Sequence, residues 1–200
     1  MRRFVVRAVN VIWHPESEWA VIARERRAWG GVFWFYLMPL ALVAPLAYSG
    51  RVLLGGEGAV RVFADAHASL PFALQAAGGG FLASLISVIA LALVSWLLAP
   101  LFAGRRSFGD ACRVVIYAGT PVWLAGGILI APLNRFPLLV IIILVAIMHS
   151  TFLFYLGVHH VLKVPRRDAA ESTAIIMVAG IMLSTVAGYY ASAAGLFPHL

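Results

Sequence analysis

Charged residues are scarce in this chain, and long stretches of it have none. Asp, Glu, Lys and Arg make up 12% of the 200 residues, whereas hydrophobic residues make up 62%. A soluble domain carries roughly 25% charged residues, so the composition excludes an ordinary soluble domain. The stretches without any Asp, Glu, Lys or Arg are Gly31–Tyr48, Gly79–Ala103, Val114–Ala131, Leu138–Leu156 and Ala174–Leu196.

The sequence also lacks the residue patterns of known catalytic and metal sites. It has no Gly-rich phosphate loop, no HExxH motif, no nucleophile elbow and no pair of carboxylates placed to act together. A single cysteine, Cys112, excludes an intramolecular disulfide. His159 and His160 are adjacent, so their side chains diverge by about 100° on a helix. We therefore expect no enzymatic activity, no cofactor and no metal site.

The five apolar stretches are long enough to cross a bilayer. About 20 apolar residues in a helix span the ~30 Å hydrocarbon core, and continuous runs of this length do not suit the alternating strands of a membrane barrel. We predict an all-α, polytopic transmembrane helical bundle with five spans. Residues 1–28 form an N-terminal cytoplasmic segment, and residues 29–200 form the membrane domain. The expected spans cover about 31–48, 79–103, 112–131, 137–158 and 174–196.

Basic residues between these stretches predict the orientation of the chain. Twelve of the 15 Lys and Arg residues lie in alternate gaps that begin with the N-terminus, and only Arg51, Arg61 and Arg135 lie in the others. By the positive-inside rule the N-terminus is cytoplasmic and the C-terminus is outside. This distribution explains the net charge of +7 without a nucleic-acid partner. The preference for Arg over Lys indicates a bacterial protein of the plasma (inner) membrane.

Residues 1–28 predict amphipathic helices rather than a span. Val5, Ala8, Val9 and Ile12 recur at helical spacing, His14-Pro15 interrupts the pattern, and Pro15 suits the first turn of a second helix. We expect that second helix to lie in the cytoplasmic interface with its tryptophans at headgroup depth. It either anchors to anionic lipid or docks a soluble partner. Its candidate contact residues are Pro15, Trp19, Ile22, Arg24, Arg26, Arg27 and Trp29.

A few polar residues interrupt the spans and are candidate intramembrane sites. His149 lies near the middle of the fourth span, and Thr120-Pro121, close to Tyr117, predicts a kink in the third. Ionisable residues inside a membrane usually face the bundle interior or a water-filled cavity. His149 either belongs to a proton relay or polar-substrate contact, or donates one interhelical hydrogen bond.

Small residues recur every fourth position in the fifth stretch. They are Gly180, Ser184, Gly188 and Ser192. Such a small-residue face lets another helix approach closely. The helix it meets lies either within the bundle, or in a second copy of the chain or another membrane protein.

The order of several short motifs resembles the Yip membrane protein family (Ypt/Rab-interacting, YIP domain), in particular its bacterial members. The resemblance covers nearly the whole chain. It rests on HPESEWAVIARE and YLMPLALVAPL, with Pro15, Trp19, Ile22, Tyr36, Pro39 and Leu40, and on Tyr117, Thr120 and Pro121. The family implies a five-span layout. Its eukaryotic members act in membrane trafficking with prenylated Rab GTPases, and no catalytic residue follows from it.

These features favour a non-enzymatic integral membrane protein. We expect a scaffold, a membrane-organising factor or an accessory subunit that acts through helix packing and a basic cytoplasmic face. Its expected partners are the bilayer, anionic lipid at the cytoplasmic face, and other membrane proteins or a second copy of the chain. The alternative is a small transporter or channel that uses the kinked third span and His149.

Overall fold

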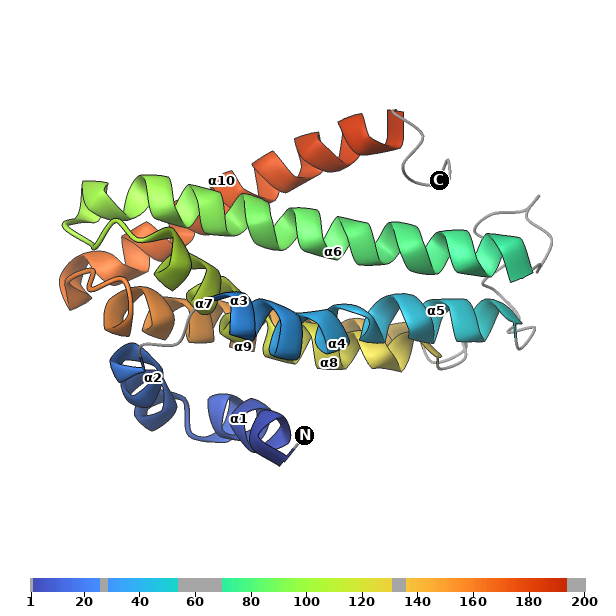
Figure 1. Cartoon of the computed structure of the whole chain (residues 1–200), viewed down its shortest axis with the longest axis horizontal. Helices are drawn as coiled ribbons and strands as arrows, with labels where there is room; N and C mark the ends of the chain where they lie inside the picture. Colours follow the sequence, from blue (N-terminus) through green and yellow to red (C-terminus); the bar gives the residue numbers. More distant parts are fainter. Residues whose placement is uncertain (1, 26–28, 54–69, 131–135, 194–200) are drawn as a thin grey trace.

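Helices make up nearly all of the described part of the chain, which comprises residues 2–25, 29–53, 70–130 and 136–193 of a computed structural model. No strand occurs in these ranges, which confirms the all-α prediction. Figure 1 shows three levels of helices. The long helices α6 (Leu70–Leu98) and α10 (Arg166–Ala193) lie on one side, and α1 (Arg2–Trp13) and α2 (Pro15–Arg24) lie on the opposite side. The remaining helices lie between them.

Within the described residues, four helical segments are long and apolar enough to cross a membrane. The first is interrupted but continuous in direction, and it contains one π-helical turn, η1. Its parts are α3 (Trp29–Val32), η1 (Phe33–Leu37), α4 (Met38–Ala41) and α5 (Val43–Leu53). The others are α6 with the 3-10 turn η2 (Ala99–Phe102), α9 (Phe136–His160) and α10. They correspond to the predicted first, second, fourth and fifth spans. α10 begins earlier than predicted and includes Arg166 and Arg167.

The predicted third span is built from three shorter helices. These are α7 (Phe108–Ala118), α8 (Thr120–Gly126) and η3 (Gly127–Ile130). α7 begins after Ser107, whose side chain accepts a hydrogen bond from the Asp110 N–H at 3.3 Å. The helix breaks at Gly119, and Pro121 occupies the first turn of α8, because proline cannot continue the hydrogen bonding of a helix. The predicted kink at Thr120-Pro121 is confirmed.

The α7 part of the third segment lies deep inside the molecule. Every residue from Ala111 to Ala118 is buried, and α7 contacts α6 and α9 while α8 contacts α5 and α9. Gly126 permits the close approach of α5, since a Cβ there would lie 2.4 Å from the Ala44 Cβ. The other helices therefore enclose α7 and the break at Thr120 and Pro121, whereas α8 exposes Val122 and Leu124.

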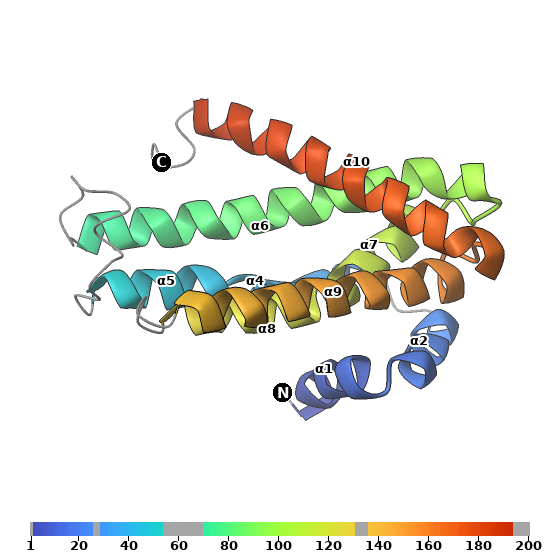
Figure 2. The same ribbon diagram turned by 180° about the vertical axis from the view of Figure 1, so that it is seen from behind.

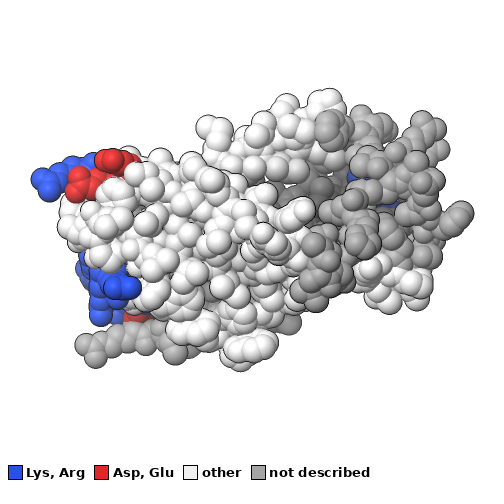
Figure 3. All heavy atoms as spheres, turned by 90° about the horizontal axis from the view of Figure 1, so that it is seen from above, with Lys and Arg blue, Asp and Glu red and all other residues white. Residues whose placement is uncertain are grey.

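The surface of the molecule is divided into a charged end and an apolar body. In Figure 3, Lys, Arg, Asp and Glu side chains gather mainly at one end of the visible face, and its middle carries none. That end carries the loop between η2 and α7 and the loop between α9 and α10. The two loops are joined by the Arg105 N–H, which donates to the Leu162 carbonyl at 2.6 Å. Figure 2 shows that α10 crosses α6 and then diverges from the bundle toward its C-terminal end.

Candidate functional site

The aromatic residues that carry the family resemblance come together from separate helices. The Trp19 ring of α2 meets the Tyr117 ring of α7 edge-on, with centroids 6.4 Å apart. Tyr36, in the π-helical turn η1, contacts the same Tyr117 ring with centroids 4.8 Å apart. Both geometries are the edge-to-face arrangement that aromatic pairs prefer. We call Trp19, Tyr36, Tyr117 and Thr120 the aromatic junction.

Two helix interruptions meet at this junction. The Thr120 hydroxyl donates to the Tyr117 carbonyl at 2.7 Å, which leaves its oxygen to accept from another group. The Tyr36 hydroxyl lies 2.9 Å from that oxygen, so we assign Tyr36 as the donor. π-turns and proline breaks leave backbone groups that side chains must satisfy inside a membrane protein. Here the Thr120 hydroxyl supplies the hydrogen bond to the Tyr117 carbonyl at the break before α8. Tyr36 then links Thr120 to the first long helical segment.

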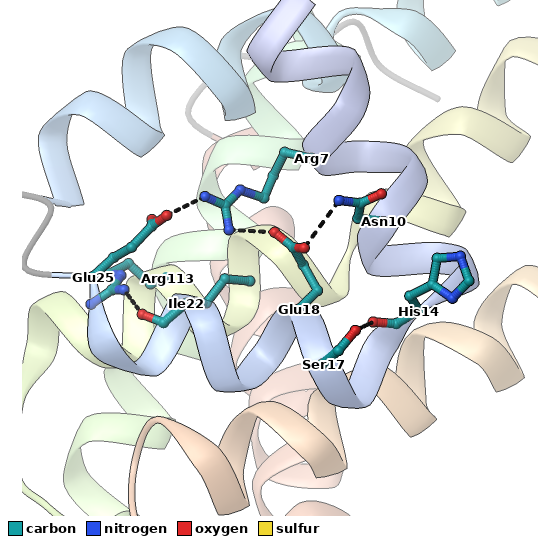
Figure 4. Close-up of polar contacts among 8 residues, drawn as sticks. All are labelled: Arg7, Asn10, His14, Ser17, Glu18, Ile22, Glu25 and Arg113. Carbon is teal, nitrogen blue, oxygen red and sulfur yellow. Dashed lines mark hydrogen bonds and ion pairs between the residues drawn. The ribbon is translucent and has the colours of Figure 1, made fainter.

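A charged group lies next to the aromatic junction and joins α1 to α2 (Figure 4). The Arg7 guanidinium forms ion pairs with both Glu18 and Glu25, and the Asn10 amide donates to Glu18 at 3.2 Å. Arg7 also lies over the Tyr117 ring, 5.9 Å from its centroid, within the range of a cation–π contact. We call Arg7, Asn10, Glu18 and Glu25 the Arg7 cluster.

Arg7 remains charged in this site. Burial lowers the pKa of Arg7, but the hydrogen bond to Glu25 and the negative charges of Glu18 and Glu25 outweigh that effect and raise the pKa above its usual value. The cluster therefore links α1 to α2 electrostatically.

Arg113 links α2 to α7. Its guanidinium donates to the Ile22 carbonyl, in the last turn of α2, and to the Asp110 carboxylate at 3.2 Å. A cation at the C-terminal end of a helix satisfies free carbonyls and complements the helix dipole. Arg7 thus ties α2 to α1, and Arg113 ties α2 to α7.

The apolar face of α2 is buried in protein, which corrects part of the expectation for this helix. Trp19 and Ile22 have no exposed surface, so neither side chain can contact lipid. Gly157 of α9 makes this possible, because a Cβ there would lie 2.8 Å from both the Trp19 ring and the Val114 Cγ1. The amphipathic stripe of α2 thus packs on the bundle rather than on lipid.

The other predicted interface residues are placed separately. Pro15 begins α2 as predicted, and Arg24 is exposed in its last turn. Trp29 is exposed and contacts the Phe108 ring with centroids 6.1 Å apart. Arg26 and Arg27 lie outside the described residues.

His149 lies apart from the aromatic junction. Its nearest ring contact is Phe152, with centroids 6.2 Å apart, and its buried Nε2 atom has no hydrogen-bond partner among the described residues. The Nδ1 atom of His159 lies 2.9 Å from the Val164 carbonyl oxygen. The Nδ1 atom of His160 lies 2.9 Å from the Leu156 carbonyl oxygen. No group of three or more possible metal ligands occurs in the described ranges.

The small-residue face of α10 is divided between two environments. Gly180 packs against α6, where a Cβ would lie 2.3 Å from the Leu91 Cδ1, whereas a Cβ on Gly188 would meet nothing within 4 Å. The Ser184 hydroxyl donates to the Gly180 carbonyl of its own helix at 2.9 Å. The Ser192 side chain is outside the described part of the structure.

Sequence reasoning missed the Arg7 cluster and the role of Arg113. The signal for the cluster was the spacing of Glu18 and Glu25, seven residues apart and so on one face of a helix. Arg7 shares a helix face with the buried Ala8 and Val11. Their opposite charges could have suggested that Arg7 pairs with Glu18 and Glu25 across the bend at His14. The apolar stripe predicted for the first helix, which includes Val5 and Val9, instead left Arg7 off the buried face.

The four long apolar helices of the described ranges, with charge gathered at one end of an apolar body (Figure 3), define a multi-pass α-helical membrane protein. A family model, the Yip1 domain, matches residues 9–188, and the chain belongs to the Yip family. No curated protein and no solved structure matches the chain. The matched range includes α2, the aromatic junction and most of α10.

Proposed function

We propose that this chain is a non-enzymatic membrane scaffold or accessory subunit that assembles with other membrane proteins or with a second copy of itself. One observation carries the proposal. The diverging half of α10 presents a small-residue surface at Gly188 that no described part of the bundle covers. Met182, Val186, Tyr189 and Tyr190, on other faces of the same stretch of α10, are also exposed. Close helix approach at small residues drives association in lipid, where apolar burial gives little.

The topology that we propose has five spans, with the N-terminus in the cytoplasm and the C-terminus outside. The segment from Phe108 to Ile130 has 23 residues, enough for roughly 34 Å of helix. Interruption at Gly119 is compatible with a span, because neighbouring helices enclose it and Thr120 satisfies the break. The basic gaps support the orientation, and the preference for Arg over Lys supports a bacterial inner-membrane location.

The basic end supplies the second contact surface. Arg105, Arg106, Arg166 and Arg167 are exposed there, and Arg106 also covers the Trp96 ring at 4.7 Å. Clusters of arginine beside membrane helices attract anionic lipid, by about 1 kcal/mol for each residue near the surface. This face therefore fits anionic lipid rather than nucleic acid.

Substitution of two glycines on α10 tests the assembly proposal. Gly188→Leu adds a side chain into open space, so the fold should persist while the oligomer or co-purifying partner profile is lost in gently solubilised membranes. Gly180→Leu should instead disturb the packing on Leu91 and lower the yield of folded protein. Val178→Leu, at an exposed site on the same helix, is the matched control. An unchanged assembly profile for Gly188→Leu would refute the proposal.

A second candidate is a small transporter or channel that uses the kinked third segment and His149. It is favoured by the meeting of two interrupted helices at Tyr36 and Thr120, since transporters often place their sites at broken helices. Proton or solute flux into liposomes tests it. A measured flux that His149→Ala leaves intact counts against a role for His149, and the absence of any flux counts against the whole candidate.

A further inference from the structure

The outward face of α1 is apolar, although the helix begins with arginines. Val5, Val6, Val9 and Trp13 are 55%, 50%, 47% and 74% exposed, respectively. Ala8 and Val11 point inward and are buried. Four large apolar side chains on one short helix are more than the isolated exposed residues that any protein surface carries.

Arg7 lies on the opposite side of α1 from this face. Arg7 is held by Glu18 and Glu25, and Asn10 is held by Glu18. Among residues 5–13, whose side chains are described, no other charged side chain occurs. The one charge among these residues is thus paired away from the outer face.

The position of α1 indicates what covers the face. α1 contacts α7 and α8, so it lies against the membrane-spanning body rather than beyond its end, on the side opposite α6 and α10 (Figure 1). An amphipathic helix in this position places its apolar face about 5–10 Å into the headgroup and acyl boundary.

We propose that the outer face of α1, formed by Val5, Val6, Val9 and Trp13, inserts into the bilayer beside the bundle. The lipid-anchoring role expected for α2 is thereby assigned to α1. α2 packs on the bundle and holds α1 through the Arg7 cluster. The proposed insertion rests on the exposed apolar face of α1 and on its position beside the bundle. Its assignment to the cytoplasmic leaflet rests on the topology proposed above.

Fluorescence quenching at single introduced cysteines tests the insertion. The background is Cys112→Ala, because Cys112 is the single native cysteine. Val9→Cys reports the outer face of α1, and Ser17→Cys, at an exposed position of α2, is the matched aqueous control. Each variant carries an environment-sensitive label in vesicles of phosphatidylcholine and phosphatidylglycerol. We expect the Val9 label to be quenched by nitroxide lipids and to be several-fold less sensitive to iodide than the Ser17 label.

Other outcomes identify other occupants of this face and overturn the proposal. Equal iodide quenching at both positions shows that the α1 face lies in water. Protection of the Val9 label from both quenchers, with disulfide formation between Val9→Cys copies, shows that a second copy covers it. Val5→Cys provides a second site on the same face if Val9→Cys does not fold.

The topology is tested separately with a membrane-impermeant maleimide. Modification of Ser17→Cys only from the cytoplasmic side supports the proposed orientation. Modification from the outside refutes that orientation and moves the inserted face to the other leaflet, while quenching by nitroxide lipids would still support insertion.

Discussion

The third segment and α10 reach similar lengths by opposite means. The third segment is broken into α7, α8 and η3, yet α7 is enclosed by other helices from Ala111 to Ala118. α10 is one continuous helix, but much of its surface is exposed, including Ile181, Val186 and Tyr189. The difference shows where an interrupted backbone is tolerated in a membrane protein. Inside the bundle, neighbouring helices and side chains can form hydrogen bonds with the backbone groups that a break leaves free. A helix that faces lipid must form all of its backbone hydrogen bonds within itself.

The largest expected difference between the two segments concerns matched isoleucines. Ile116 of α7 is fully buried and Ile181 of α10 is 58% exposed. Ile116→Ala removes packed methyl groups and leaves a cavity, so it should lower the free energy of unfolding by about 2–5 kcal/mol. Ile181→Ala should change it by less than about 0.5 kcal/mol. Unfolding of purified monomer in mixed micelles with increasing SDS measures both, and equal losses would mean that α10 is also enclosed.

Sequence features located the helices because the governing signals are local. The charge-free stretches correspond to the long helices, Pro15 begins α2, and the break falls beside Thr120-Pro121. Each signal acts within a few residues, through missing charge or a missing N–H.

The contacts of the Arg7 cluster and of Trp19 could not be predicted from such local signals. Helical spacing on α1 allows a stripe through Val5 and Val9 or one through Arg7 and Val11, and the choice depends on Glu18 and Glu25 beyond the bend. An apolar face with Trp19 suits lipid as well as protein. Its burial depends on Gly157, which is far along the chain and clears space for the ring.

The next expected difference concerns two glycines. A Cβ at Gly126 of α8 would lie 2.4 Å from the Ala44 Cβ, and a methyl carbon cannot swing away. Gly126→Ala should therefore separate α8 from α5 and destabilise the fold by about 1–3 kcal/mol. Gly188→Ala meets open space and should be neutral or should stabilise α10 by up to about 1 kcal/mol, because alanine favours helix. The same SDS titration compares them, and a stable Gly126→Ala variant would show that α5 and α8 separate easily.

The smallest expected difference concerns two threonine hydroxyls. Thr120 is buried and joins Tyr36 to the Tyr117 carbonyl, whereas the exposed Thr185 donates only within its own helix, to the Ile181 carbonyl at 2.8 Å. Thr120→Val keeps the side-chain shape but removes the link between the two interrupted segments. Interhelical hydrogen bonds in membrane proteins contribute about 0.6 kcal/mol on average, and we expect a loss of that order. Thr185→Val should have no measurable effect.

A double-mutant cycle assigns the Thr120 loss to its contact with Tyr36. If the two hydroxyls interact as the geometry indicates, Tyr36→Phe and Thr120→Val should together cost less than the sum of the separate changes. Full additivity would mean that Thr120 acts only through the Tyr117 carbonyl, by satisfying the break before α8. The link between the first and third segments would then rest on ring contacts and on the packing of Ala44 against Gly126, and the enclosure of α7 would not depend on the hydroxyl pair.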